Sequence, residues 1–211
     1  MKTVVFDVES GPLPEAELHL LEPAFEPARN LKDPDKIRAD LDAKRQAWRE
    51  NAALSAVTGQ VLAVGLLRNG AFEAFTAPEP EIIDRFWREW IGSQPIQARF
   101  VGFNILAFDL PFLIRRSWHH RIPVPDDLRT NGRYWHPRFI DLREVWQLGD
   151  RQAHGKLDDL AKHLAVGAKN GSGADFARLL ATDHAAAMAY LENDLRLTAA
   201  IHDVLCPVGT Y

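Results

Sequence analysis

Two acidic residues, Asp7 and Glu9, follow an apolar run at positions 4–6, close to the start of the chain. The run is rich in β-branched and aromatic residues, which predicts a short buried strand. Residues two apart on a strand point to the same face, so we expect the two carboxylates roughly 6 to 7 Å apart on one side. Two acids this close repel unless a cation lies between them or one is protonated. Because hard divalent cations prefer oxygen ligands, the pair predicts half of a Mg²⁺ or Mn²⁺ site. The alternative is that Glu9 already belongs to a loop and faces water.

A second candidate for the site is Asp109, in the stretch VGFNILAFDLPFL at 101–113. Asn104 follows a predicted strand, and Asp109 stands directly before Leu-Pro at the expected start of a helix. Asp is a preferred N-cap and Pro is favoured in the first helical turn, so a capping role is one interpretation. An acid at the carboxyl end of a strand also faces the edge of a sheet where sites form. The two roles are compatible.

The third candidate pair is Tyr190 and Asp194, in the Ala- and Leu-rich segment 184–205. This segment has no internal Gly or Pro and predicts a long helix. Residues four apart lie on one helical face, so the phenol and the carboxylate are expected to be neighbours. In isolation the alternative is a tyrosine at the edge of the core and an aspartate paired with a basic residue.

The remaining pattern predicts the elements that must position these side chains. Asn69-Gly70 between two apolar runs is a strong hairpin signal for 58–77. Residues 11–27 predict a loop with at most a short helical piece. Further strands are expected at 98–104 and at the start of 139–146, which then enters a helix. Helical spacing or composition predicts helices at 34–52, 79–91, 108–120, 157–166 and 184–205. Strands alternating with helices predict one mixed α/β domain.

Composition limits the classes of protein that are possible. The chain has 211 residues, of which 46% are apolar, so it can bury a substantial core and is not a disordered chain. A formal net charge of −4 argues against a protein that coats nucleic acid by bulk charge. The single cysteine, Cys206, excludes an intramolecular disulfide. Neither a signal peptide nor a membrane span is indicated, so we expect a soluble cytoplasmic protein that binds no membrane.

Taken in order, the three motifs resemble those of a known nuclease family. Phe-Asp-x-Glu on the first strand, Asn-x-x-x-Phe-Asp at a strand–helix junction and Tyr-x-x-x-Asp on the last helix are similar to the motifs of DEDD 3′–5′ exonucleases, in the subclass whose third motif carries Tyr. The chain looks most like the proofreading domain of family-B DNA polymerases as a stand-alone protein. Segments 54–67 and 156–173 also resemble the family. The resemblance implies an RNase H-like α/β fold with a central mixed sheet flanked by helices. It further implies a single exonuclease domain over 1–211, in which 11–53 is an insertion or helical elaboration.

The resemblance also implies roles for individual residues. Asp7, Glu9 and Asp194 would bind one of two divalent cations, Mg²⁺ or Mn²⁺, and Asp7 would bridge to the second. Asp109 would hold the second cation through water, and Tyr190 would orient the attacking water. Asp and Glu suit this task because they stay ionised beside cations.

The substrate implied by the resemblance is single-stranded nucleic acid, with DNA expected more than RNA or short oligonucleotides. Asn104 and Phe108 are candidates for contacting the terminal nucleotide, although Phe108 also suits the core. Arg133 lies in RTNGRYWHPR at 129–138, which mixes cations with stackable rings and suits a single strand; a surface turn is the alternative. Lys169, in a Gly-rich loop, could reach phosphates, and a solvated lysine is the default.

Two other functions remain open from the residues alone. Haloacid-dehalogenase-type phosphatases also place a nucleophilic Asp after a buried strand, as Asp7 is placed here, and need a second Asp two residues later. The second acid here is Glu9, which is one methylene longer, so that match is partial. A nucleic-acid-binding domain without catalysis is the other alternative; the five intact acidic and phenolic positions argue against it.

Overall fold

The computed structural model describes residues 3–95, 97–130, 134–150, 152–153 and 155–207. The chain divides into two compact units. One is formed by Met1–Glu9 together with Val61–Tyr211, and the other by Ser10–Gln60. All the predicted site residues fall in the first unit.

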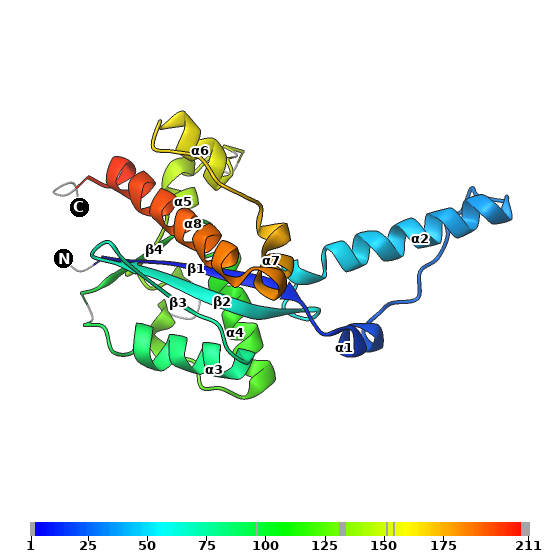
Figure 1. The fold of residues 1–211 in the computed structure, drawn as a ribbon, viewed down its shortest axis with the longest axis horizontal. Coiled ribbons are helices and arrows are strands. Elements are labelled where there is room, and N and C mark those ends of the chain that lie inside the picture. Colours follow the sequence, from blue (N-terminus) through cyan, green and yellow to red (C-terminus); the bar gives the residue numbers. More distant parts are fainter. Residues whose placement is uncertain (1–2, 96, 131–133, 151, 154, 208–211) are drawn as a thin grey trace. The chain divides into compact units, whose positions relative to one another are not determined.

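A five-stranded sheet forms the centre of the first unit (Figure 1). Its strands lie in the order β3-β2-β1-β4-β7. They are β1 (Thr3–Pro12), β2 (Gly59–Arg68), β3 (Ala71–Phe75), β4 (Arg99–Gly102) and β7 (Phe139–Asp141). β4 runs parallel to both β1 and β7, whereas β3 runs antiparallel to β2, so the sheet is mixed. Because β1, β4 and β7 are parallel neighbours, their carboxyl ends meet at one edge of the sheet.

The predicted hairpin is formed by β2 and β3. Arg68 pairs with Ala71, and the two residues between them, Asn69 and Gly70, have φ of 51° and 79°. Positive φ at both central residues is the requirement of the tight hairpin turn, and Asn and Gly adopt it at little cost. The sequence therefore predicted this connection and its position correctly.

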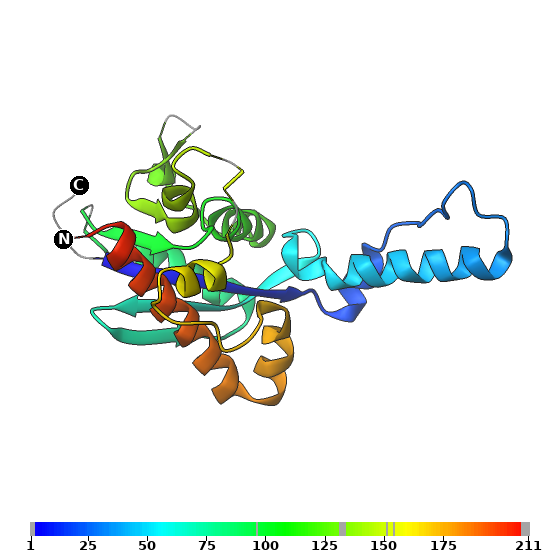
Figure 2. The ribbon, with the colours of Figure 1, turned by 90° about the horizontal axis from the view of Figure 1, so that it is seen from above.

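Helices cover both faces of the sheet (Figures 1 and 2). One face carries α3 (Glu79–Arg85), which continues as a π-helical turn at Phe86–Ile91, and α4 (Asp109–His120). Figure 1 shows α8 (His184–Leu205) on the other face, and α7 (Phe176–Thr182) lies beside its first turns. A Cβ added at Gly65 of β2 would lie 2.8 Å from Leu191 and Leu195, so α8 packs directly on the strand. The sheet and its two helical layers confirm the predicted α/β, RNase H-like architecture.

The expected helices are present, with differences at their ends. α5 (Leu142–Gln147) follows β7 directly, and α6 (Leu157–His163) is shorter than predicted. α7 was not predicted, because seven residues after a Gly-rich loop are too few for a clear periodic pattern. Shorter pieces are η3 (Asp126–Leu128), η4 (Gly173–Asp175), β5 (Arg129–Thr130) and β6 (Tyr134–Trp135).

The Ser10–Gln60 unit consists of two helices and a short turn: α1 (Glu15–Leu20), α2 (Pro34–Glu50) and η1 (Ala52–Leu54). Asp33 caps α2, since its carboxylate accepts hydrogen bonds from the N–H groups of Asp35 and Lys36. None of the α2 residues is buried. A small apolar cluster of Leu13, Leu18, Ala52 and Trp48 supports the unit. The assignment of 11–53 as an insertion in a single exonuclease domain stays a prediction. No helix within the described ranges has the length and hydropathy of a membrane span.

Candidate active site

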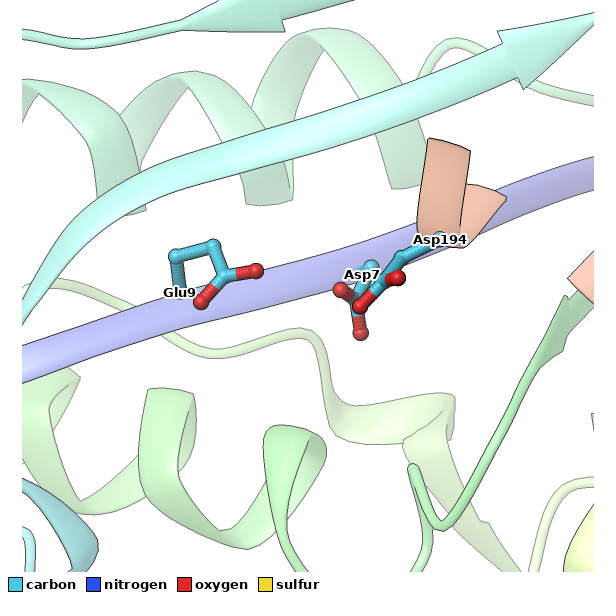
Figure 3. A group of neighbouring side chains, drawn as sticks. All are labelled: Asp7, Glu9 and Asp194. Atoms are coloured by element: carbon cyan, nitrogen blue, oxygen red, sulfur yellow. The ribbon is translucent and has the colours of Figure 1, made fainter. Parts of the chain in front are cut away.

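Strand β1 brings the first two acids to one side of the sheet. Phe6 and Val8 are buried in the core, so Asp7 and Glu9 alternate to the opposite face. α8 places Asp194 above them, and ligand oxygens of the three carboxylates all lie within 4.8 Å of one another (Figure 3). Glu9 is only 7% exposed, so the interpretation of Glu9 as a water-facing loop residue is wrong.

The grouped carboxylates are electrostatically unfavourable when ionised. Burial, together with the charge of Asp194, raises the pKa of Asp7 to about 6. Burial and then the charges of Asp7 and Asp194 raise the pKa of Glu9 well above its usual value. Burial also raises the pKa of Asp194, although Lys169 acts in the opposite direction. A site with this pattern is stabilised by added positive charge.

Helix α8 presents Tyr190 one turn before Asp194, and a single lysine contacts both. The ammonium of Lys169 donates a hydrogen bond to the Tyr190 hydroxyl at 2.7 Å and another to Asp194 Oδ2. Lys169 is held in place through its own backbone N–H, which donates to Asp158 Oδ1 at 2.8 Å. Burial, reinforced by the charge of Glu9, raises the pKa of the Tyr190 phenol above its ordinary value, so the O–H stays protonated.

Asp109 is tied to the strand that carries the first pair of acids. It is the first residue of α4, and the N-cap is Phe108, so the capping interpretation of Asp109 is wrong. Its Oδ1 instead accepts a hydrogen bond of 3.0 Å from the backbone N–H of Val8, between Asp7 and Glu9. Burial, followed by the charge of Asp7, raises the pKa of Asp109 well above its usual value.

A further buried acid, Asp141, organises the loop between β4 and α4. Its two carboxylate oxygens accept hydrogen bonds from the N–H groups of Asn104 at 2.8 Å and Leu106 at 2.9 Å. Asn104 has φ of 66°, and its side-chain oxygen accepts a hydrogen bond of 2.8 Å from Arg143. A Cβ at Gly102 would lie 2.2 Å from Ile105, so the close turn of this loop requires glycine. We did not predict roles for Asp141 and Arg143; the signal for Asp141 was an acid within the strand expected at the start of 139–146.

Most of the predicted site residues line one cavity of about 740 Å³, a volume typical of ligand sites. Its lining includes Asp7, Glu9, Asn104, Phe108, Asp109, Lys169, Tyr190 and Asp194. The structure therefore brings together eight of the nine predicted site residues. The ninth, Arg133, lies outside the described residues. The cavity also contains residues that we did not predict for the site: Arg143, Trp146, Lys156, Asp159 and His163.

The donor set fits divalent cations. Asp7, Glu9 and Asp194 offer carboxylate oxygens, which Mg²⁺ and Mn²⁺ prefer. Among the described residues Asp194 Oδ1 is buried without a hydrogen-bond partner, so one lone-pair acceptor is free inside the cluster. A bound cation would give the buried oxygen a partner. It would also favour the ionised carboxylates and so lower their raised pKa values.

A family model matches residues 45–198, more than half of the chain. The matched region contains Asn104, Asp109, Tyr190 and Asp194 but begins after Asp7 and Glu9, so the assignment of the first pair depends on the geometry above. A search of the curated proteins found no match. The chain belongs to the family described as predicted 3′–5′ exonucleases related to the exonuclease domain of PolB.

Proposed function

We propose that the chain is a two-metal-ion 3′–5′ exonuclease of the Tyr subclass that removes nucleotides from the 3′ end of single-stranded nucleic acid, DNA more than RNA. The observation that carries the proposal is the convergence of Asp7, Glu9 and Asp194 within 4.8 Å, with Tyr190 one helical turn from Asp194. The proposed preference for DNA comes from the likeness to family-B proofreading domains.

The proposed division of labour is the one that the family resemblance implies, and the grouping of Asp7, Glu9 and Asp194 supports its first part. Asp7, Glu9 and Asp194 would hold one cation and Asp109 would hold the second, with Asp7 shared. The cations that these residues would hold would supply polarisation of the phosphodiester, a lower pKa for water and neutralisation of charge on the leaving 3′-oxygen. The hydrolysis releases a nucleoside 5′-monophosphate and leaves a new 3′-hydroxyl.

Tyr190 is suited to orient the attacking water and not to remove its proton. Its phenol stays protonated because its pKa is raised, so it acts as a hydrogen-bond donor. Lys169 restrains the Tyr190 hydroxyl and Asp194 Oδ2 with one ammonium, which keeps the two side chains in a fixed relation. Asn104 and Phe108 line the same cavity and would contact the terminal nucleotide.

The test is digestion of a 5′-labelled single-stranded DNA oligonucleotide with Mg²⁺ or Mn²⁺. We expect a ladder that shortens from the 3′ end, and a loss on the order of 100-fold or more for Asp194→Asn. Asp203→Asn is the matched control, because Asp203 lies on the same helix with its side chain 83% exposed. Full activity in excess EDTA, or in Asp194→Asn, would contradict the proposal. Hydrolysis of small phosphate monoesters that is indifferent to Tyr190→Phe would instead favour the phosphatase.

A further inference from the structure

Helices α5 and α6 supply a part of the cavity that the proposed chemistry does not use. We call the residues Arg143, Trp146, Lys156 and His163 the α5–α6 wall; all four line the cavity. The acids that would bind cations come instead from β1, α4 and α8. The wall contributes cationic and aromatic groups. One acid, Asp159, also lines the cavity next to the wall, and it accepts a hydrogen bond from the backbone N–H of Lys156 at 3.1 Å. The cavity therefore combines an acidic cluster with a wall suited to anionic and aromatic ligands.

The guanidinium of Arg143 is only partly paired by groups of the described residues. One of its terminal nitrogens donates to Asn104 Oδ1 at 2.8 Å. Its Nε is buried, and within the described ranges it has no hydrogen-bond partner. No carboxylate oxygen of the described residues lies within 4 Å of the guanidinium as an ion pair. An uncompensated guanidinium beside a cavity is a favourable site for a phosphate.

Trp146 and His163 provide an aromatic surface next to this guanidinium. Their ring centroids lie 5.5 Å apart with an interplanar angle of 70°. Trp146 is half-buried and packs against the hydrophobic core, so its position is supported from beneath, whereas His163 is exposed. A supported, partly open indole is the kind of surface on which a nucleic-acid base stacks.

We propose that the α5–α6 wall is the subsite for the nucleotide on the 5′ side of the scissile phosphodiester. Its base stacks on Trp146, and Arg143 holds its phosphate. The inference rests on the proposed function and deepens it, because a second nucleotide subsite would let the cavity bind a nucleic-acid strand and not only its terminal nucleotide. Asn104 links the two subsites, because it takes the hydrogen bond from Arg143 and also lines the cavity beside Phe108.

Two substrates separate this subsite from the one for the terminal nucleotide. The p-nitrophenyl ester of thymidine 5′-monophosphate has a terminal nucleotide and no nucleotide on its 5′ side, whereas (dT)10 has both. For Trp146→Leu, which keeps an apolar side chain against the core, we expect the ratio of the KM for (dT)10 to the KM for the ester to rise about 10-fold. Trp146→Phe should restore most of the wild-type ratio. Trp118→Leu is the matched control, because Trp118 is 68% exposed on α4 and does not line this cavity.

A binding measurement tests the same subsite without hydrolysis. In an Asp7→Asn background, the affinity for labelled (dT)10 is measured as salt is varied, with and without Arg143→Gln. Loss of one phosphate contact should reduce the slope of log K against log salt by about 0.7. Glutamine keeps an amide donor for Asn104, so the loop is retained.

The outcomes separate the two proposals. Equal changes in both KM values, or none, for Trp146→Leu would overturn the subsite, as would an unchanged salt slope for Arg143→Gln. If the wild-type protein hydrolyses neither substrate, the exonuclease proposal fails. The binding measurement then still decides whether the wall holds a strand.

Discussion

The backbone N–H of Val8 donates to Asp109 Oδ1 at 3.0 Å, joining two residues that are 101 positions apart. Val8 stands between Asp7 and Glu9, so the acid of the second motif is attached to the strand that carries the first. Asp109 is 3% exposed, so this bond is shielded from water. The hydrogen bond couples the start of α4 to β1 and holds Asp109 beside Asp7 and Glu9 at one end of the sheet.

Substitutions of Asp109 should separate this structural role from a catalytic one. Asp109→Asn keeps an acceptor for Val8 but removes the negative charge. We therefore expect a nearly unchanged free energy of unfolding in urea and a loss of exonuclease activity on the order of 100-fold. Asp109→Leu leaves the buried N–H without a partner and should also lower the free energy of unfolding by about 1 to 3 kcal/mol. Equal destabilisation by both substitutions would show that the bond to Val8 is not the main contribution.

The cluster of acids should make the metal-free protein less stable than its inactive variants. Burial and the charge of Asp194 disfavour ionised Asp7, so Asp7→Asn should raise the melting temperature in EDTA while abolishing activity. Mg²⁺ or Mn²⁺ should raise the melting temperature of the wild-type protein more than that of the variant, because cation binding stabilises the folded state. Differential scanning fluorimetry measures both effects. A lower melting temperature for Asp7→Asn in EDTA would contradict the expected repulsion.

Glu79 and Arg116 form a buried ion pair away from the cavity. Oε1 of Glu79 accepts hydrogen bonds from Arg116 Nε at 2.9 Å and from the N–H of Val61 at 2.7 Å, and Oε2 lies 2.6 Å from His120 Nε2. Burial opposes ionisation, but the hydrogen bonds from Arg116, His120 and Val61 outweigh it and lower the pKa of Glu79. Glu79→Gln would remove the negative charge that faces the buried guanidinium of Arg116 and should lower the free energy of unfolding by about 3 kcal/mol near neutral pH.

The pH dependence of this difference follows from the sign of the pKa shift. Because the folded pKa of Glu79 lies below its value in the unfolded chain, the stabilisation is fully present above about pH 4.5 and is lost as pH falls through the folded pKa. Urea denaturation from pH 7 to pH 3 should therefore show the wild-type protein approaching Glu79→Gln. Glu73→Gln is the control: Glu73 pairs with Arg68 and Arg85 at a more exposed site, so at most about 1 kcal/mol is expected.

Asp141 should support activity through the loop that it holds. Asp141→Ala removes the acceptor for the N–H groups of Asn104 and Leu106, and we expect a loss of about 2 kcal/mol in the free energy of unfolding. Misplacement of Asn104 should also lower activity about 10-fold. Asp150→Ala is the control, since Asp150 is exposed and accepts a bond from Gln152 in a local turn. Wild-type activity in Asp141→Ala would exclude a positioning role.

The sequence predicted the parts of the protein that depend on local pattern. The Asn69-Gly70 turn, the helix at 184–205 and the buried strand before Asp7 follow from residue conformation and side-chain periodicity, which act over a few residues. α7 and the exact ends of α6 did not follow, because short helices depend on packing against neighbours more than on propensity. The π-helical turn at 86–91 also lacks a clear local signal.

The same distinction applies to the site. Asp7 and Glu9 could be singled out in the sequence, since carboxylates after a buried strand have few structural uses. The tertiary structure alone decided that Lys169 bonds both Tyr190 and Asp194, and that Asp141 and Arg143 hold Asn104. These contacts join residues 21 to 39 positions apart, and they exist because β4 and β7 are parallel neighbours and a loop returns across α8. Hydrogen bonds between such distant residues depend on how the elements pack, which no local pattern specifies.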